Sequence, residues 1–210
     1  MLDPPIIRRP LDRYRGCLLG LAVGDALGAP VEFLTDTAIR DRYGRDGITD
    51  LVPWDPHAAG SYTDDTQMSL ATAHGLLAAF RRHARDGSAD PVSSVHAAYG
   101  AWLETQADPR QCRAPGQTCM AALASGRRGT IDQPLNNSKG CGGVMRMAPV
   151  GLAFPTDLAF RYGAEFAAIT HGHPSGYLTG GYIAELVARL VEGEDLGTAV
   201  TAVVESLAAY

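Results

Sequence analysis

The sequence predicts an all-α protein with one sizeable hydrophobic core. Three observations lead to this class. Apolar residues recur at helical spacing along most of the chain, no segment alternates in the manner of a strand, and 46% of the 210 residues are apolar. We therefore expect an N-terminal extension over residues 1–11 and a single helical domain over residues 12–210.

The expected helices are separated by glycine, proline and short polar stretches. The first has apolar residues from Tyr14 to Val23 and stops before Pro30, and the second ends in a basic cluster before Gly87. Residues 33–62 show little periodicity and read as a long surface loop. The predicted helices are 12–27, 64–85, 92–105, 119–125, 158–170, 176–191 and 197–209.

Charge and cysteine usage exclude several classes of protein. The chain has 18 basic and 23 acidic residues, a net charge of −5, and no basic block of the kind that holds a nucleic-acid backbone. No apolar run reaches the roughly 18 residues needed to span a bilayer, and the first ten residues lack the apolar core of a signal peptide. The four cysteines form no CxxC pair. We expect a cytoplasmic protein with no membrane or nucleic-acid partner.

A cluster of oxygen-bearing side chains opens the second helix at Thr63, Asp64, Asp65 and Thr66. One interpretation is helix capping, with Asp64 as N-cap and Gln67 three residues later, because acids are favoured at the positive end of a helix dipole. The other is a site for a hard cation such as Mg²⁺, Mn²⁺ or Ca²⁺, which prefers clustered carboxylate and hydroxyl oxygens. The tetrapeptide cannot supply six ligands alone.

Two further acids lie near the end of the first helix. Asp25 stands among small residues and is typical of a helix-interior acid that bonds a nearby backbone group, while Glu32 follows Pro30 and is typical of a solvated surface acid. Neither is specific in isolation.

A polar, glycine-rich stretch from Asn136 to Gly143 precedes the apolar segment 144–149. Its successive backbone N–H groups are suited to an anion-binding nest, although a flexible surface loop is an equal alternative. It is neither a Walker A motif nor a dinucleotide fingerprint. Cys141 within it is not expected to act as a nucleophile, because no general base is marked for it.

A pair of histidines, His171 and His173, precedes Pro174, which has the place of a first helical residue. Such histidines most often meet the negative end of a helix dipole, and less often ligate a transition metal. His171 is also suited to packing against a ligand ring or donating a hydrogen bond to it.

Taken together and in this order, the motifs carry more information than each does alone. The segments Arg15–Glu32, Tyr62–Thr66, Asn136–Pro149 and Thr170–Gly176 closely resemble the ADP-ribosylglycohydrolase family. The resemblance extends from Tyr14 to about Val191.

This resemblance implies an orthogonal bundle of helices around a dinuclear site for magnesium, or for manganese in some members. It also implies a hydrolase that removes ADP-ribose from arginine or another acceptor, so that ADP-ribose and ADP-ribosylated proteins are the expected partners. By position, the metal ligands are Thr63, Asp64 and Asp65, and the catalytic residues are Glu32 and Asp65. The expected ligand-binding residues are Gly140, Cys141, Gly142, Gly143, Met145 and His171.

The sequence departs from the family pattern in one respect. Family members carry a second acidic motif of Gly-Gly-Asp-Thr-Asp type near their C-terminus, and this chain reaches Tyr210 without it. The nearest substitute, residues 192–195, reads as a solvated loop with Asp195 as an N-cap. We expect a C-terminally truncated form of the fold with an incomplete second metal site. Three explanations stay open: a fragment, a missing segment supplied by a second polypeptide, or a non-catalytic ADP-ribose-binding module.

Overall fold

The computed structural model describes residues 10–210, so most of the predicted extension 1–11 lies outside the described residues. Within them the chain forms helices and no strand, with one isolated β-bridge between Trp54 and His57. The α-helices are α1 (Leu11–Gly28), α2 (Asp36–Tyr43), α3 (Asp64–Asp86), α4 (Pro91–Thr105), α5 (Gln117–Ala124), α6 (Ala148–Ala153), α7 (Thr156–Ala168), α8 (Pro174–Glu192) and α9 (Leu196–Ala208), with 3₁₀ turns η1 (Ala29–Val31) and η2 (Cys141–Gly143).

The predicted all-α class is confirmed, and each expected helix is present with its ends shifted by two residues at most. Two helices were not predicted. The helix α2 lies inside the expected long loop; it buries no residue and is mostly polar, so it leaves no apolar period in the sequence. The other, α6, is six residues long and buried along most of its length, which hides its period as well.

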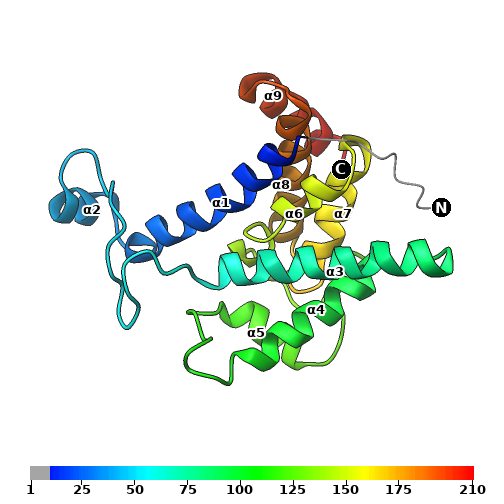
Figure 1. Ribbon diagram of the computed structural model, residues 1–210, viewed down its shortest axis with the longest axis horizontal. Helices are drawn as coiled ribbons and strands as arrows, with labels where there is room; N and C mark the ends of the chain where they lie inside the picture. Colours follow the sequence, from blue (N-terminus) through cyan, green and yellow to red (C-terminus); the bar gives the residue numbers. More distant parts are fainter. Residues whose placement is uncertain (1–9) are drawn as a thin grey trace.

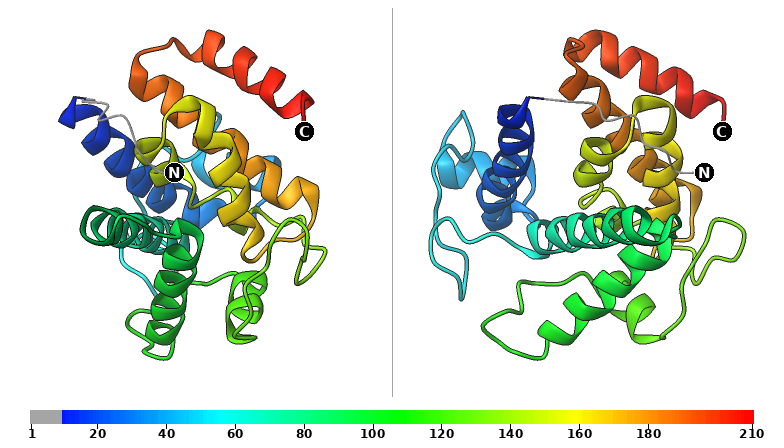
Figure 2. Two further views of the ribbon diagram at one scale, coloured as in Figure 1. Left: turned by 90° about the vertical axis from the view of Figure 1, so that its right-hand side faces the viewer. Right: turned by 45° about the vertical axis from the view of Figure 1, so that its right-hand side comes forward.

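The helices pack in two groups that meet at α3 (Figure 1). Beneath α3 lie α4 and α5, and above it lie α6, α7 and α8, with α7 and α8 packed against each other. The helix α9 crosses the far end of α8, as both views in Figure 2 show. A core of buried side chains from α3, α4, α6, α7 and α8 joins the two groups, with Phe154 at its aromatic centre, stacked on Tyr162 at 4.2 Å between ring centroids.

The first helix stands apart from this core (Figure 2, right). Ala26 is its one buried residue, while Leu19 and Val23 are more than half exposed. Its C-terminal end reaches the start of α3, where the candidate site lies. No single described helix is long and apolar enough to cross a membrane. Of the described helices, only the pair formed by residues 11–31 and α2 has enough length and apolar character, and this pair is bent by 94°.

Small residues allow α7 and α8 to approach closely. A Cβ atom added to Gly163 would lie 2.5 Å from the Gly180 carbonyl oxygen and 2.6 Å from the Ala184 Cβ. By contrast, nothing lies within 4 Å of a Cβ added to Gly100, which is also inside a helix. The close contact therefore depends on glycine at position 163.

We expect Gly163→Ala to lower the free energy of unfolding by about 1–3 kcal/mol, because the added methyl group must push two packed helices apart. The matched control Gly100→Ala should raise it by about 0.5–1 kcal/mol through helix propensity. Urea unfolding followed by circular dichroism measures both. Equal effects of the two substitutions would contradict the close packing of α7 on α8.

Candidate active site

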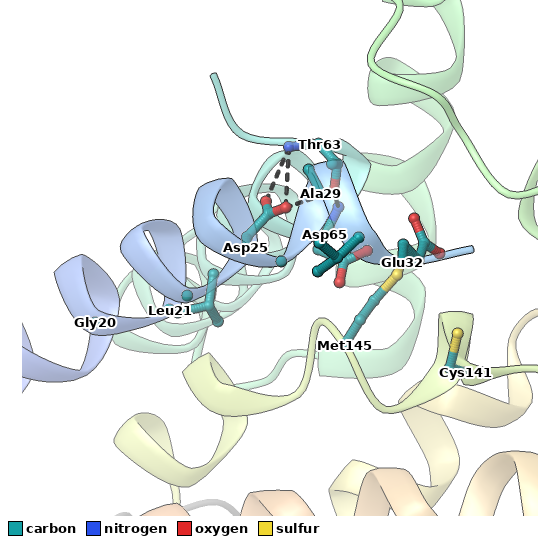
Figure 3. A pocket seen from close by; sticks show the side chains of 12 residues that line it. Gly20, Leu21, Asp25, Ala29, Glu32, Thr63, Asp65, Cys141 and Met145 are labelled. Carbon is teal, nitrogen blue, oxygen red and sulfur yellow. Dashed lines mark hydrogen bonds between the residues drawn. The ribbon is translucent and has the colours of Figure 1, made fainter. Parts of the chain in front are cut away.

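A single carboxylate joins α1 to the start of α3. Asp25 accepts hydrogen bonds from the backbone N–H of Thr63 at 3.0 and 3.1 Å and from its hydroxyl at 2.7 Å. It also accepts from the N–H and hydroxyl of Thr66, at 3.0 and 2.6 Å. This set, called the Asp25 bridge below, uses both carboxylate oxygens and satisfies N–H groups that a helix start leaves unpaired. Figure 3 shows the part of it that joins Asp25 to Thr63. The bridge fixes where the end of α1 meets α3.

The helix start itself differs from the capping predicted from the sequence. Thr63, rather than Asp64, is the N-cap of α3, and its hydroxyl oxygen accepts from the Asp65 N–H at 3.2 Å. Asp64 and Asp65 therefore both lie in the first turn, where the helix dipole favours negative charge. The prediction of Asp64 as N-cap was wrong because Thr63 both caps the helix and donates to Asp25.

A cavity of about 540 Å³ opens where α1, α3 and the glycine-rich stretch meet (Figure 3). Its walls include the predicted residues Glu32, Thr63, Asp65, Cys141 and Met145, together with Asp25 and the small residues of α1. The segments 24–32, 63–65 and 141–145, far apart in the sequence, thus share one cavity. A second cavity of about 540 Å³, between α3 and α4, is lined largely by apolar and small side chains and has no carboxylate.

The carboxylates of this cavity repel one another. Burial and the charges of Asp64, Asp25 and Glu32 raise the pKa of Asp65 to about 7. Burial raises the pKa of Asp64 to about 6, against the opposing effect of the hydrogen bond from the Gly116 N–H at 3.1 Å. Loss of part of its water shell and the charge of Asp25 also raise the pKa of Glu32. Asp64 and Asp65 therefore take up protons near neutral pH.

Asp64 is the one predicted metal ligand that does not line the cavity. Its side chain is 6% exposed, and its Oδ2 is turned to the backbone before α5. Asp64 acts on the cavity through its charge, which helps to raise the pKa of Asp65.

The glycine-rich stretch, residues 136–147 and called the glycine loop below, forms the opposite wall. Asn136 anchors it, because its side-chain amide donates to the Thr170 carbonyl at 2.8 Å and its Oδ1 accepts from the Gly172 N–H at 3.2 Å. A Cβ added to Gly143 would lie 2.5 Å from the Gly176 carbonyl oxygen, so the loop packs tightly on the start of α8. An ordered and anchored loop replaces the flexible surface loop that the sequence left open.

The remaining predicted ligand-binding residues lie around or beneath this loop. Gly140 is exposed, Gly143 is buried and His171 is only 1% exposed. The imidazole of His171 lies under the loop rather than in the cavity, so its direct contact with a ligand stays a prediction. Partial burial and the charge of Asp65 raise the pKa of the Cys141 thiol, which disfavours the thiolate that a nucleophile requires.

The donors around the cavity fit a hard divalent cation in kind, since carboxylate and hydroxyl oxygens are the ligands that Mg²⁺ and Mn²⁺ prefer. Among the ion pairs of the described residues, none relieves the repulsion of Asp25, Glu32, Asp64 and Asp65. These metal-ligating groups are too few in number. Within residues 10–210, no three Asp, Glu, His or Cys side chains converge closely enough to hold a metal ion. A cation here needs further oxygens.

Two residues of this region were missed or underestimated in the sequence. Asp25 was expected to bond only a nearby backbone group. Its bridging role could have been inferred from the small residues on either side of it, because they allow this helix to approach another closely. Arg146 was not singled out, although a lone arginine within the apolar segment 144–149 indicates a buried guanidinium. The structure buries it completely, at 0% exposure.

Comparison with known proteins identifies the family of the chain. The family model described as ADP-ribosylglycohydrolase matches residues 7–210. The chain belongs to the ADP-ribosylglycohydrolase family. It is 34% identical over 190 residues to the ADP-ribosyl-[dinitrogen reductase] glycohydrolase of Rhodospirillum rubrum, covering 88% of this chain and 60% of that protein. It is 32% identical over 203 residues to the bovine ADP-ribosylhydrolase ARH3, covering 89% and 52% of the two chains.

A solved structure of this family shares the fold. The protein described as an ADP-ribosylglycohydrolase-related protein complex superimposes with a TM-score of 0.64 at 25% identity, covering 92% of this chain and 61% of that one. This likeness agrees with the helical bundle of the family that the resemblance implied. The chain spans between about half and three fifths of the length of these relatives.

The raised pKa of Asp65 predicts how the stability of the metal-free protein changes with pH. The folded state binds this proton more tightly than the unfolded chain does, so the contribution to stability is present below about pH 4 and is lost as the pH rises through about 7. Asp65→Asn should therefore raise the free energy of unfolding at pH 8 by about 1 kcal/mol, after discounting for solvent screening, and raise Tm by about 2–4 °C.

Thermal unfolding in the presence of EDTA at pH 5 and pH 8 measures this effect. Asp46→Asn, which changes an exposed aspartate in a loop, is the matched control and should leave Tm unchanged at both values. A Tm of Asp65→Asn below that of the parent protein at pH 8 would show that Asp65 is not destabilised by its neighbours.

The Asp25 bridge makes a separate prediction about α1. Asp25→Ala should cost about 2–3 kcal/mol, because donors of Thr63 and Thr66 lose their acceptor, and Asp25→Asn should cost less because one acceptor oxygen is kept. Hydrogen exchange resolved by segment should show faster exchange in the C-terminal half of α1 and the first turn of α3. Asp12→Ala, an exposed change in the same helix, is the control; the same exchange pattern in both alanine variants would rule out the bridge.

Proposed function

We propose that the cavity between α1, α3 and the glycine loop binds ADP-ribose, and that the protein removes ADP-ribose from modified arginine or another acceptor with the help of Mg²⁺ or Mn²⁺. The observation that carries this proposal is the meeting of the acidic start of α3, Glu32 and the glycine loop around one cavity. The names of the relatives support an ADP-ribose-containing substrate.

The residues suit the chemistry of a glycosidic bond. Breaking the bond at the distal ribose builds positive charge at the anomeric carbon, so carboxylates close to that carbon stabilise the transition state. Asp65 or Glu32 accepts the proton of the attacking water, a role that fits carboxyls whose pKa values are raised toward neutral pH. The glycine loop, with Cys141 and Met145 on the cavity wall, holds the diphosphate and ribose end of the ligand.

Thr63, Asp64 and Asp65 would hold the cation, with water and the vicinal hydroxyls of ribose supplying further oxygens. Bound there, a divalent cation lowers the pKa of a coordinated water and offsets the negative charge of the carboxylates. Asp64 reaches such a site only if its side chain turns from the Gly116 N–H.

A second function, a non-catalytic ADP-ribose-binding module, has its own support. The described residues do not gather three potential metal-ligating side chains, as a catalytic metal site would require. Calorimetry with ADP-ribose, with and without Mg²⁺, combined with an assay for release of ADP-ribose from ADP-ribosylated arginine, separates the two. Binding with metal-dependent release supports the hydrolase, and binding without release supports the module.

We expect Asp65→Ala and Asp64→Ala to abolish metal-dependent release, a loss of at least about 100-fold, because each removes a carboxylate from the acidic start of α3. Asp12→Ala should retain the parent rate. Release is measured at saturating Mg²⁺ on folded samples checked by circular dichroism. Retained release in both α3 variants would overturn the assignment of these carboxylates.

A further inference from the structure

The buried guanidinium of Arg146 has no carboxylate partner among the ion pairs of the described residues. Instead its Nη1 donates to the Cys119 Sγ at 3.2 Å and its Nη2 donates to the Thr170 Oγ1 at 2.6 Å. Its Cζ lies 4.5 Å from the centroid of the Tyr99 ring. Its buried Nε has no hydrogen-bond partner within residues 10–210. Because an unpaired buried cation is costly, the bonds that Arg146 does make to Cys119 and Thr170 are strongly favoured.

The bond to Thr170 determines where the threonine hydroxyl sends its own proton. A guanidinium has donors only, so the Thr170 oxygen must accept from Arg146. The one hydroxyl hydrogen is then directed to the Nδ1 of His171, 2.9 Å away. If Nδ1 carried the proton instead, the threonine hydrogen would point into a fully buried site, where Thr170 is 0% exposed.

His171 is therefore neutral, with its proton on Nε2. Burial and the charge of Arg146 lower the pKa of His171 to about 4, which keeps the imidazole uncharged at neutral pH. Because Nδ1 accepts from Thr170, the single ring proton is on the opposite nitrogen.

That nitrogen faces the glycine loop from below. A Cβ added to Gly140 would lie 3.4 Å from the His171 Nε2, and one added to Gly142 would lie 2.8 Å from the His171 Cε1 and 2.8 Å from the Cys119 Sγ. Cys119 and His171 thus both lie against Gly142, and Arg146 holds both of them. It bonds Cys119 directly and His171 through Thr170.

We propose that Arg146, acting through Thr170, fixes His171 as the neutral Nε2–H tautomer, and that His171 in this form is a positioning residue for Gly140 and Gly142 of the glycine loop. The bond from Thr170 holds the orientation of the imidazole, and the packing of the ring beneath Gly140 and Gly142 holds the loop backbone at the wall of the cavity. The consequence for ligand binding rests on the proposed function, whereas the tautomer and the order of the loop do not.

The tautomer is measured by long-range ¹H–¹⁵N correlation on protein labelled with ¹⁵N-histidine, with His171 assigned through the missing signal in His171→Gln. We expect a protonated Nε2 and an unprotonated Nδ1 from pH 6 to pH 8. Thr170→Val removes the hydroxyl but keeps the shape, and should give a mixture of tautomers, while Thr170→Ser should restore the parent pattern. A protonated Nδ1 in the parent protein, or a Thr170→Val spectrum identical to it, would overturn the proposal.

The role in the loop is measured by hydrogen exchange at the Gly140 and Gly142 amides. We expect exchange about tenfold faster in Thr170→Val, corresponding to about 1.4 kcal/mol, and unchanged exchange in Thr170→Ser. Thr201→Val, which removes a hydroxyl that bonds only within α9, is the matched control. Unchanged exchange in Thr170→Val would sink the positioning role.

Calorimetry with ADP-ribose separates this inference from the proposed function. If the parent protein binds ADP-ribose, Thr170→Val should bind about tenfold more weakly, and Thr170→Ser and Thr201→Val should bind as the parent does. If the parent protein does not bind ADP-ribose, the proposed function fails while the tautomer and exchange results still decide the positioning role. Equal affinity of all variants would restrict His171 to a structural role.

Discussion

The candidate site depends above all on the carboxylate of Asp25. Since Ala26 is the one buried residue of α1, side-chain packing contributes little to its position, and the Asp25 bridge fixes its end against Thr63 and Thr66. The same carboxylate also adds a negative charge that raises the pKa of Asp65. The Asp25 carboxylate thus holds the walls of the cavity together and also adds to the repulsion between its negative charges. This combination is typical of sites where a bound ligand offsets the repulsion.

The sequence predicted the helices that bury a face, because burial imposes the helical period on the chain. It did not predict α2, which buries nothing, or α6, which is buried on so many sides that apolar residues occur without a period. The capping error at Asp64 has a different cause. A threonine hydroxyl can accept from the backbone and donate to a distant acid at once, and the distant acid, Asp25, is 39 residues away from the predicted N-cap.

For the site, local motifs in the sequence identified candidate residues but did not predict which of them contact one another. The structure places Glu32, Thr63, Asp65, Cys141 and Met145 around one cavity. It places His171 beneath the glycine loop and turns Asp64 toward the Gly116 N–H. These details follow from contacts between segments distant in the chain, and the dependence of His171 on Arg146 passes through Thr170, whose hydroxyl has no signature in the sequence.

The position of α1 on α3 has a consequence for any ligand that contacts both helices. Only molecules in which α1 rests on α3 present Asp25 and Glu32 together with Asp65, so the observed dissociation constant equals the intrinsic one divided by the fraction of molecules in that arrangement. Leu19 and Val23 lie on the exposed flank of α1 and, unlike their neighbours Leu21 and Gly24, do not line the cavity. A change there that alters how firmly α1 is seated would shift ligand affinity while every contact in the cavity stays the same.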